Sequence, residues 1–197
     1  MSLHKETLPE NTLTVFENLF QNQAMAATQG TLLGGTALSL QIKHRLSEDL
    51  DFTYFTEKLP SREINTLLSD LKAKGWRIVN TLDQSKISQA KINGFDLEDF
   101  IREYSFDGVK ISFCVMNKGS DSRRDYFKNA SCLKIDGSFK ILDVKSLFES
   151  KSVVLMDRVK SRDIYDLMVL IVDHGYQIKV ACFIIQLHKN SFKYRVL

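Results

Sequence analysis

Apolar residues recur at helical spacing in three stretches of the first half of the chain. They cover residues 11–29, 36–45 and 60–74, and the last stretch ends at Gly75. Between the first two stretches, residues 31–35 read TLLGG, a short apolar run closed by paired glycines. We therefore predict three helices, with a strand and a glycine turn leading into the second of them.

A period of two replaces the helical period in DLDFTYF, residues 49–55. Asp49, Asp51 and Thr53 alternate with apolar neighbours, so we predict a strand whose polar face is exposed or lines a site. Further strands are predicted in the segments WRIVNTL, KISQAKI, FDLEDFIREYSF and VKISFCVM. Asn93-Gly94 and Asp107-Gly108 supply hairpin turns, and Asp136-Gly137 joins CLKI to FKIL in the same way.

Helical periodicity returns after Asp143, a predicted cap, and a second helix of this part stops near Gly175. The pattern as a whole predicts an α+β fold: a small sheet of at least four strands, flanking helices and a helical C-terminal part. We place the boundary between an α/β core, residues 1–142, and a helical part packed on it, residues 143–197.

Composition indicates an ordinary globular protein, with 44% hydrophobic and 26% charged residues. No stretch reaches the roughly 20 apolar residues of a membrane span, and the first residues lack the apolar core of a signal peptide. We therefore expect a soluble, cytoplasmic protein without a membrane partner. Cys114, Cys132 and Cys182 are far apart among apolar neighbours, which predicts buried thiols.

The formal net charge is only +3, and the basic residues gather near the C-terminus. Residues 177–197 carry Lys179, Lys189, Lys193 and Arg195 without an acidic residue. Such a tail suits either a solvated amphipathic helix, the more frequent case, or contact with a nucleic-acid backbone. Lys118, Arg123, Arg124 and Lys128 are further basic candidates for the same backbone.

The paired acids of the predicted strand are candidates for a metal site. Asp49 and Asp51 share one face, where their charges repel unless water screens them or a divalent cation lies between them. Mg²⁺ prefers one or two carboxylates together with substrate phosphate oxygens. Asp-x-Asp by itself is weak evidence for a metal site, because a solvent-facing strand explains most such pairs.

The glycine turn upstream makes a phosphate site a second candidate. Gly34, Gly35 and Thr36 lie between a strand and a helix, where backbone N–H groups can approach an anion closely. A tight structural turn is the alternative, because the spacing of a P-loop is absent. A phosphate cradle, one helix and a metal-binding strand together suit nucleotidyl transfer, in which a hydroxyl attacks the α-phosphorus of an NTP and pyrophosphate leaves.

The segment LLGGTALSLQIKHRLSEDLDF resembles the signature of the AbiEii/AbiGii-type nucleotidyltransferases, a branch of the polymerase-β-like fold that includes toxins of type IV toxin–antitoxin and abortive-infection systems. KSVVLMDRVKSRDIYDL resembles the C-terminal helical motif of the same family. The resemblance implies a Mg²⁺-dependent transferase, and it leaves open one metal ion or two and Mn²⁺ as a substitute. It also implies NTP as substrate, RNA as acceptor with the tRNA 3′ end foremost, and a cognate antitoxin.

Carried over residue by residue, the resemblance assigns Asp49 and Asp51 to the metal and to catalysis, and Asp163 to the acceptor, as orienting group or base. The nucleotide-binding assignments are Gly34, Gly35, Thr36, Arg45, Ser47 and Lys151. His44, Lys160, Arg162, Tyr165 and Asp166 match further motif positions. Surface roles for Lys151, Asp163 and Asp166, with the acids paired to Lys160 or Arg162, remain the alternative.

Ser112 stands where many relatives carry an acid in a strand like VKISFCV. A hydroxyl is a weaker Mg²⁺ ligand than a carboxylate and no base at neutral pH. Asp163 or Glu48 could assist, as could an acid among Asp96, Glu98, Asp99 and Glu103. The alternative function is a catalytically degenerate module of the same fold that binds NTP or regulates a partner.

Overall fold

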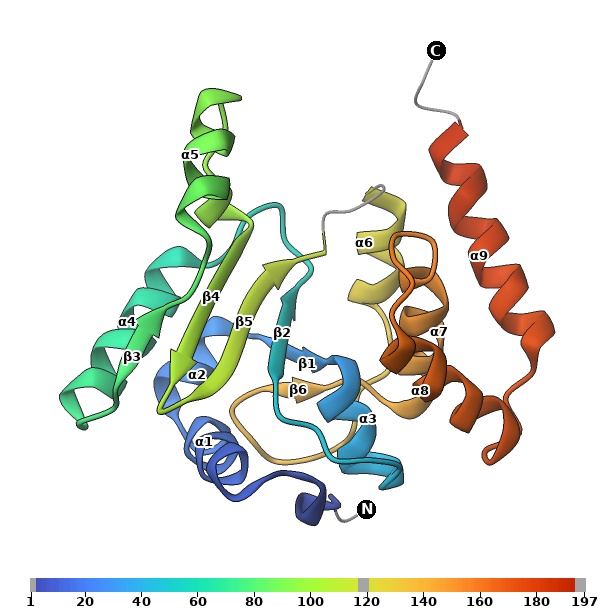
Figure 1. Ribbon diagram of the computed structural model, residues 1–197, viewed down its shortest axis with the longest axis horizontal. Coiled ribbons are helices and arrows are strands. Elements are labelled where there is room, and N and C mark those ends of the chain that lie inside the picture. Colours follow the sequence, from blue (N-terminus) through green and yellow to red (C-terminus); the bar gives the residue numbers. More distant parts are fainter. Residues whose placement is uncertain (1–2, 117–120, 194–197) are drawn as a thin grey trace.

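One mixed sheet organises the molecule. The computed structural model describes residues 3–116 and 121–193, and its strands lie in the order β3-β4-β5-β2-β1-β6 (Figure 1). Their bounds are β1 (Thr31–Leu33), β2 (Leu50–Tyr54), β3 (Ile78–Asn80), β4 (Ile101–Phe106), β5 (Val109–Val115) and β6 (Lys140–Ile141). Because β2 pairs antiparallel with β1 and parallel with β5, it lies inside the sheet. The predicted α+β class with a small mixed sheet is confirmed.

Helices flank this sheet on several sides. They are α1 (Glu10–Phe20), α2 (Gln23–Thr28), α3 (Gly34–Ile42), α4 (Ser61–Ala73), α5 (Gln84–Ile92), α6 (Asp121–Lys128), α7 (Val144–Val154), α8 (Ser161–Val172) and α9 (Ile178–Lys193), with short 3-10 turns η1 (Lys5–Thr7) and η2 (Leu97–Asp99). Helices α6 to α9 gather on one side of the sheet, and α5 projects at the opposite side, near β4 (Figure 1). Within the described ranges, no helix is both long and apolar enough to cross a bilayer.

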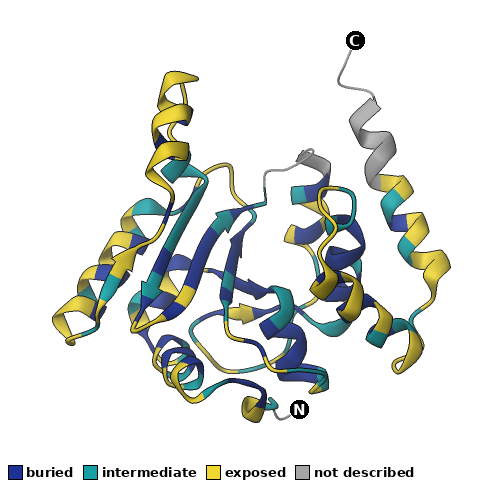
Figure 2. Ribbon diagram, viewed as in Figure 1, coloured by how far each residue is buried: buried dark blue, intermediate teal, exposed yellow. Residues whose placement is uncertain are grey.

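The alternation of residues 49–55 explains how the core and the polar face share β2. Leu50, Phe52 and Tyr54 are buried in the main apolar cluster. The ribbon of the central strands is accordingly coloured largely as buried (Figure 2). The Phe52 ring lies 5.7 Å from that of Phe113 and 4.9 Å from that of Phe139, measured between centroids. Asp51 and Thr53 therefore point to the opposite face of the sheet.

The first predicted helix is interrupted. The stretch from residue 11 to residue 29 forms α1 and α2, and the second begins afresh because Asn22 caps it: its side chain accepts hydrogen bonds from the backbone N–H groups of Ala24 and Met25. The cap predicted at Asp143 is confirmed, since its side chain accepts a hydrogen bond from the backbone N–H of Ser146 at the start of α7.

The strand predicted for KISQAKI is wrong. This segment lies in α5, where Asp83 caps the first turn and Ile87 and Ala90, three positions apart, form the buried side. Gly94, with φ +81°, follows the end of this helix instead of turning a hairpin. The Asp107-Gly108 hairpin is confirmed, because it joins β4 to β5 with both residues at positive φ.

The hairpin predicted around Asp136-Gly137 is present only in part. Of CLKI, Cys132 alone forms a bridge, to Leu142, and β6 has only two residues. Gly137 does not have the positive φ expected of it. It is needed for a different reason, because a Cβ at this position would lie 2.2 Å from the ring of Phe20.

The prediction of three buried thiols is wrong for Cys182 and only partly met by Cys114 and Cys132. Cys114 and Cys132 are partly buried, whereas Cys182 is exposed on α9. All three are free thiols.

Candidate functional site

The glycine turn and the acid of β2 lie side by side. The register of β1 and β2 places Leu33 opposite Asp51, and Gly34 follows Leu33 with φ +81°. Oδ2 of Asp51 lies only 3.1 Å from the point that a Cβ of Gly34 would occupy. Leu33 caps α3 without a side-chain hydrogen bond, so N–H groups of the first turn stay available beside this carboxylate.

Asp49 lies one residue before the start of β2 and is partly exposed. Its backbone carbonyl accepts a hydrogen bond from Oγ1 of Thr36, and the same hydroxyl lies 2.8 Å from Oγ of Ser47. Within the described part of the chain, the Asp49 carboxylate has no hydrogen-bond or ion-pair partner. Thr36 and Ser47, predicted to bind nucleotide, are buried and fasten the segment that carries Asp49 to α3.

Ser112 lies in register with Asp51 on β5, and its hydroxyl donates a 2.6 Å hydrogen bond to Oδ1 of Asp51. Glu103 is in register with Ser112 on β4, so it shares their face one strand further along. The other acids considered as substitutes lie elsewhere. Asp96 and Glu98 belong to the capped turn η2, Asp99 pairs with Lys58, and Glu48 is exposed.

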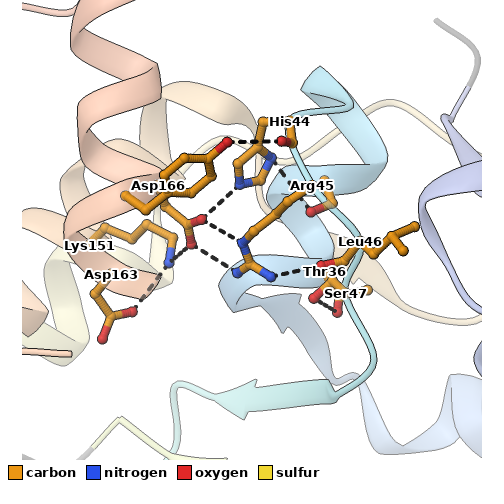
Figure 3. A network of polar contacts seen from close by, with 10 residues as sticks. Thr36, His44, Arg45, Leu46, Ser47, Lys151, Asp163 and Asp166 are labelled. Carbon is orange, nitrogen blue, oxygen red and sulfur yellow. Dashed lines mark hydrogen bonds and ion pairs between the residues drawn. The ribbon is translucent and has the colours of Figure 1, made fainter. Parts of the chain in front are cut away.

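A buried network surrounds Asp166 of α8 (Figure 3). This carboxylate is fully buried and accepts hydrogen bonds from His44 Nε2 at 2.7 Å, Arg45 Nε at 2.8 Å and Arg45 Nη2 at 3.1 Å. Lys151 Nζ of α7 approaches its Oδ2 at 2.6 Å. A carboxylate only accepts, so Nε2 of His44 carries the hydrogen. The network joins the segment after α3 to both α7 and α8.

Charge balance explains why Asp166 tolerates burial. Burial alone works to raise the pKa of Asp166, but hydrogen bonds from His44 and Arg45 and the charge of Lys151 outweigh it, and the pKa is held well below its usual value. The same pairing raises the pKa of Arg45, with the Asp166 hydrogen bond as the largest cause. Asp166 is therefore ionised at neutral pH.

Lys151 and Asp163 lie inside the same network and are both buried. Lys151 Nζ lies 3.4 Å from Oδ1 of Asp163. Oδ2 of Asp163 is buried without a hydrogen bond, although the exposed Arg158 brings its Nε to 3.3 Å. The surface pairing with Lys160 or Arg162 is thus wrong for both acids of α8.

Arg45 links this network to the glycine turn. A Cβ on Gly35 would lie 2.0 Å from Nη2 of Arg45, so the guanidinium rests directly on the backbone at the start of α3. Nη1 of Arg45 donates to the carbonyl of Leu46 at 3.0 Å. Only glycine allows this approach, which accounts for the second residue of the Gly-Gly pair.

The donor set suits a small hard cation. Among the described residues, no cluster of three or more His, Cys, Asp or Glu is arranged to hold a metal ion. Mg²⁺ does not require one, because it commonly takes one or two protein carboxylates and completes its shell with water and phosphate oxygens. Asp49, whose carboxylate is unengaged, and Asp51, beside the glycine turn, fit that requirement.

Asp166 and His44 hold a central place in the buried network that was not predicted from the sequence. A signal was present: Asp163 and Asp166 share a helical stripe with the buried Leu167 and Leu170, at spacings of three, four and seven. Acids on the apolar face of a helix require buried partners. Which cations supply them could not be read from the spacing.

One basic candidate for a nucleic-acid backbone is unsuitable. Arg123 is buried, and its Nη1 donates to Asp157 at 2.8 Å. Lys118 lies outside the described residues, as do the side chains of Lys189 and Lys193. Lys128 and Lys179 are exposed.

The chain is similar to a known protein family, to a bacterial relative and to a solved structure. The family model described as "Nucleotidyl transferase AbiEii toxin, Type IV TA system" matches residues 19–195. An uncharacterized protein of Aquifex aeolicus (strain VF5) is 32% identical over 149 residues, which are 75% of this chain; the chain spans 60% of that relative's length. A crystal structure from H. pylori, whose nucleotidyltransferase assignment is provisional, superposes with a TM-score of 0.52 at 19% identity over 88% of this chain and 75% of the other.

Proposed function

Because the chain belongs to the AbiEii nucleotidyltransferase toxin family, we propose that it transfers a nucleoside monophosphate from an NTP to an acceptor hydroxyl. In that reaction an acceptor oxygen bonds to the α-phosphorus, the bond to the β-phosphate oxygen breaks, and pyrophosphate leaves. The hydroxyl proton passes to a base. The observation that carries the proposal is the position of the Asp51 carboxylate beside the start of α3, with Oδ2 3.1 Å from the point that a Cβ of Gly34 would occupy.

The triphosphate would lie at the first turn of α3. N–H groups of Gly34 and Gly35 face it there, and the partial positive charge of the helix start favours an anion. The guanidinium of Arg45 rests on Gly35 and adds a full positive charge at the same place. These groups bind and orient the nucleotide.

Asp49 and Asp51 would hold the Mg²⁺ that accompanies the NTP, with Mn²⁺ as a substitute. When bound, the cation neutralises developing charge on the phosphate oxygens. Ser112 fixes the orientation of Asp51 by its hydrogen bond to Oδ1 and leaves Oδ2 toward the glycine turn.

Asp163 is the proposed group on the acceptor side, as orienting residue or base. Its buried Oδ2 lacks a hydrogen bond, so an acceptor hydroxyl could donate to it. Lys151 is buried and pairs with the other oxygen of Asp163 and with Asp166, so its predicted contact with nucleotide phosphate stays a prediction. The proton of the hydroxyl would end on Asp163 Oδ2.

We further propose RNA, with the tRNA 3′ end foremost, as the acceptor, and a role as the toxin of a toxin–antitoxin or abortive-infection system in the cytoplasm. The type IV toxin–antitoxin description of the family supports a cognate antitoxin. The exposed basic residues Lys128 and Lys179 can meet an RNA backbone, whereas the buried Arg123 cannot.

Incubation with Mg²⁺, each labelled NTP and total tRNA tests the transfer. Wild-type protein should incorporate label, and Asp49→Ala should lose incorporation by about a thousandfold or more while its unfolding midpoint stays unchanged. Asp136→Ala is the matched control, since it removes an exposed aspartate far along the chain from this site. Undiminished incorporation by Asp49→Ala would remove the acid pair from the reaction.

The alternative is a degenerate module that binds NTP and transfers nothing. Ser112 favours it, because a hydroxyl occupies the position where a third carboxylate would join Asp51. NTP binding without incorporation in the same assay would establish this alternative.

A further inference from the structure

We propose that Asp166 is a positioning residue that holds the guanidinium of Arg45 against Gly35, so that the free edge of Arg45 meets the nucleotide triphosphate. The inference rests on the proposed function for the identity of the ligand. It assigns the carboxylate of α8 a role that is exerted entirely through Arg45.

Two hydrogen bonds to Asp166 hold the guanidinium of Arg45 in a fork. Nε and Nη2 of Arg45 both donate to Asp166, at 2.8 and 3.1 Å, which fixes the plane of the guanidinium. Nη1 donates to the carbonyl of Leu46, which fixes the remaining end. The N–H groups left over on Nη1 and Nη2 have no partner among the described residues.

The guanidinium of Arg45 lies against the backbone of Gly35. Nη2 lies 2.0 Å from the point that a Gly35 Cβ would occupy, so the free edge lies at the first turn of α3. The Arg45 side chain keeps 20% of its exposure, whereas Asp166 has none. Arg45 can therefore touch a ligand at the turn, and Asp166 can act only from behind it.

The residue that holds Arg45 must be a carboxylate, because Asp166 accepts from several donors at once. Asp166 is also approached by Lys151 Nζ at 2.6 Å and His44 Nε2 at 2.7 Å. An asparagine in its place offers one acceptor oxygen and an N–H₂ group that faces donors, so it cannot accept from all of them. The fork on Arg45 would be lost, and its long side chain would be free to leave Gly35.

Binding of a non-hydrolysable NTP with Mg²⁺ tests this proposal without requiring turnover. Asp166→Asn should weaken binding on the order of tenfold, as the loss of an orienting partner does at other sites. Arg45→Lys keeps the charge but loses the fork, and it should weaken binding at least as much. If Asp166 acts through Arg45, the double variant binds no more weakly than Arg45→Lys alone.

Asp157→Asn is the matched control. It removes the acid from another ion pair, Arg123–Asp157 at 2.8 Å, outside this network, and NTP affinity should stay within about twofold of wild type. Equal NTP affinity of Asp166→Asn and wild type would overturn the proposal. It would also be overturned if the double variant lost as much NTP affinity as the Asp166→Asn and Arg45→Lys losses added together.

A second variant serves if Asp166→Asn does not fold. Gly35→Ala leaves Asp166 in place but puts a methyl group where Nη2 lies, so the guanidinium must move. If Gly35→Ala weakens NTP binding in the wild-type protein but not in the Arg45→Lys variant, the result supports the proposal. If Gly35→Ala weakens binding equally in both proteins, the result overturns it. Wild-type binding without nucleotide transfer would overturn the transferase function alone, whereas no binding of any NTP would overturn both.

Discussion

Ser112 bears on the strength of the proposed cation site. It is buried, in register with Asp51, and occupied by its hydrogen bond to that carboxylate. A carboxylate at the same position would face Asp51 directly, where like charges repel without a metal and share one when it is present.

Ser112→Asp should therefore make stability depend on Mg²⁺. Without the metal we expect a loss on the order of 1–4 kcal/mol from repulsion of neighbouring carboxylates. Saturating Mg²⁺, at about 100 times its Kd, should return roughly 2.7 kcal/mol, more than wild type gains. Thermal unfolding with EDTA or Mg²⁺ measures this, with the uncharged Ser112→Asn as control. Equal Mg²⁺ responses of Asp and Asn variants would argue against a cation at this face.

Asp166 should make the free energy of unfolding depend on pH in the acidic range. Its pKa is lowered in the folded state, so the unfolded state binds more protons as pH falls below about 4, the ordinary range of an aspartate. The contribution of Asp166 is therefore complete above that range and is lost as pH falls through the lowered folded value. Urea unfolding of wild type should show a steeper fall between about pH 4 and pH 2 than Asp166→Asn. Parallel pH curves for the two proteins would contradict the lowered pKa.

Residue-level prediction succeeded where the information was local. Asp51 and Gly34 could be placed near one another because only α3 and a short connection separate them, and the register of β1 and β2 sets Asp51 opposite Leu33, the residue before Gly34. Asp166 and Arg45 are 121 residues apart in the sequence, and no spacing of residues predicts a contact over such a separation. The position of Asp51 beside the glycine turn was thus recoverable from pattern, whereas the Asp166 network was not. The metal-binding role of Asp49 and Asp51 stays a prediction.

At the scale of elements, helices with a regular apolar stripe were predicted correctly, whereas a helix with a weak stripe was not. α4 and α8 carry regular apolar stripes and a glycine at positive φ after each, so both could be recognised. α5 buries only Ile87 and Ala90 and is otherwise exposed (Figure 2). So weak a stripe does not distinguish a short helix from a strand, and the cap at Asp83 was the better indicator.

The turn between β1 and α3 gives a prediction of its own. Gly34→Ala introduces a side chain at φ +81° and brings its Cβ to 3.1 Å from Oδ2 of Asp51. Gly75→Ala is a matched control, because φ is +89° and nothing lies within 4 Å. Both should lose about 1–2 kcal/mol of stability for the backbone conformation. Only Gly34→Ala should also weaken Mg²⁺–NTP binding, which titration measures; equal binding by both variants would separate the turn from the site.

At the scale of the whole molecule, the predicted boundary at residue 142 does not divide the apolar core. Leu147, Phe148, Leu167 and Leu170 belong to the same buried cluster as Leu38 of α3. Gln41 of α3 also donates to the carbonyl of Leu142 at 2.8 Å, at the boundary itself. Together with the Asp166 network, these contacts tie the helical part to the element that carries the glycine turn.

The two parts should consequently unfold together. Trp76, the single tryptophan, follows α4 within residues 1–142, so its fluorescence reports on that part, while far-UV circular dichroism reports on helices of both. We expect coincident urea transitions for the two signals, since separation would leave buried charges unpaired at a cost of about 3–5 kcal/mol. A fragment of residues 1–142 lacks Lys151 and Asp166 and the apolar residues that cover α3, so it should show no cooperative transition. A dichroism change that precedes the fluorescence change, or a cooperatively folded fragment, would mean that the helical part is an independent unit and that the site can form without it.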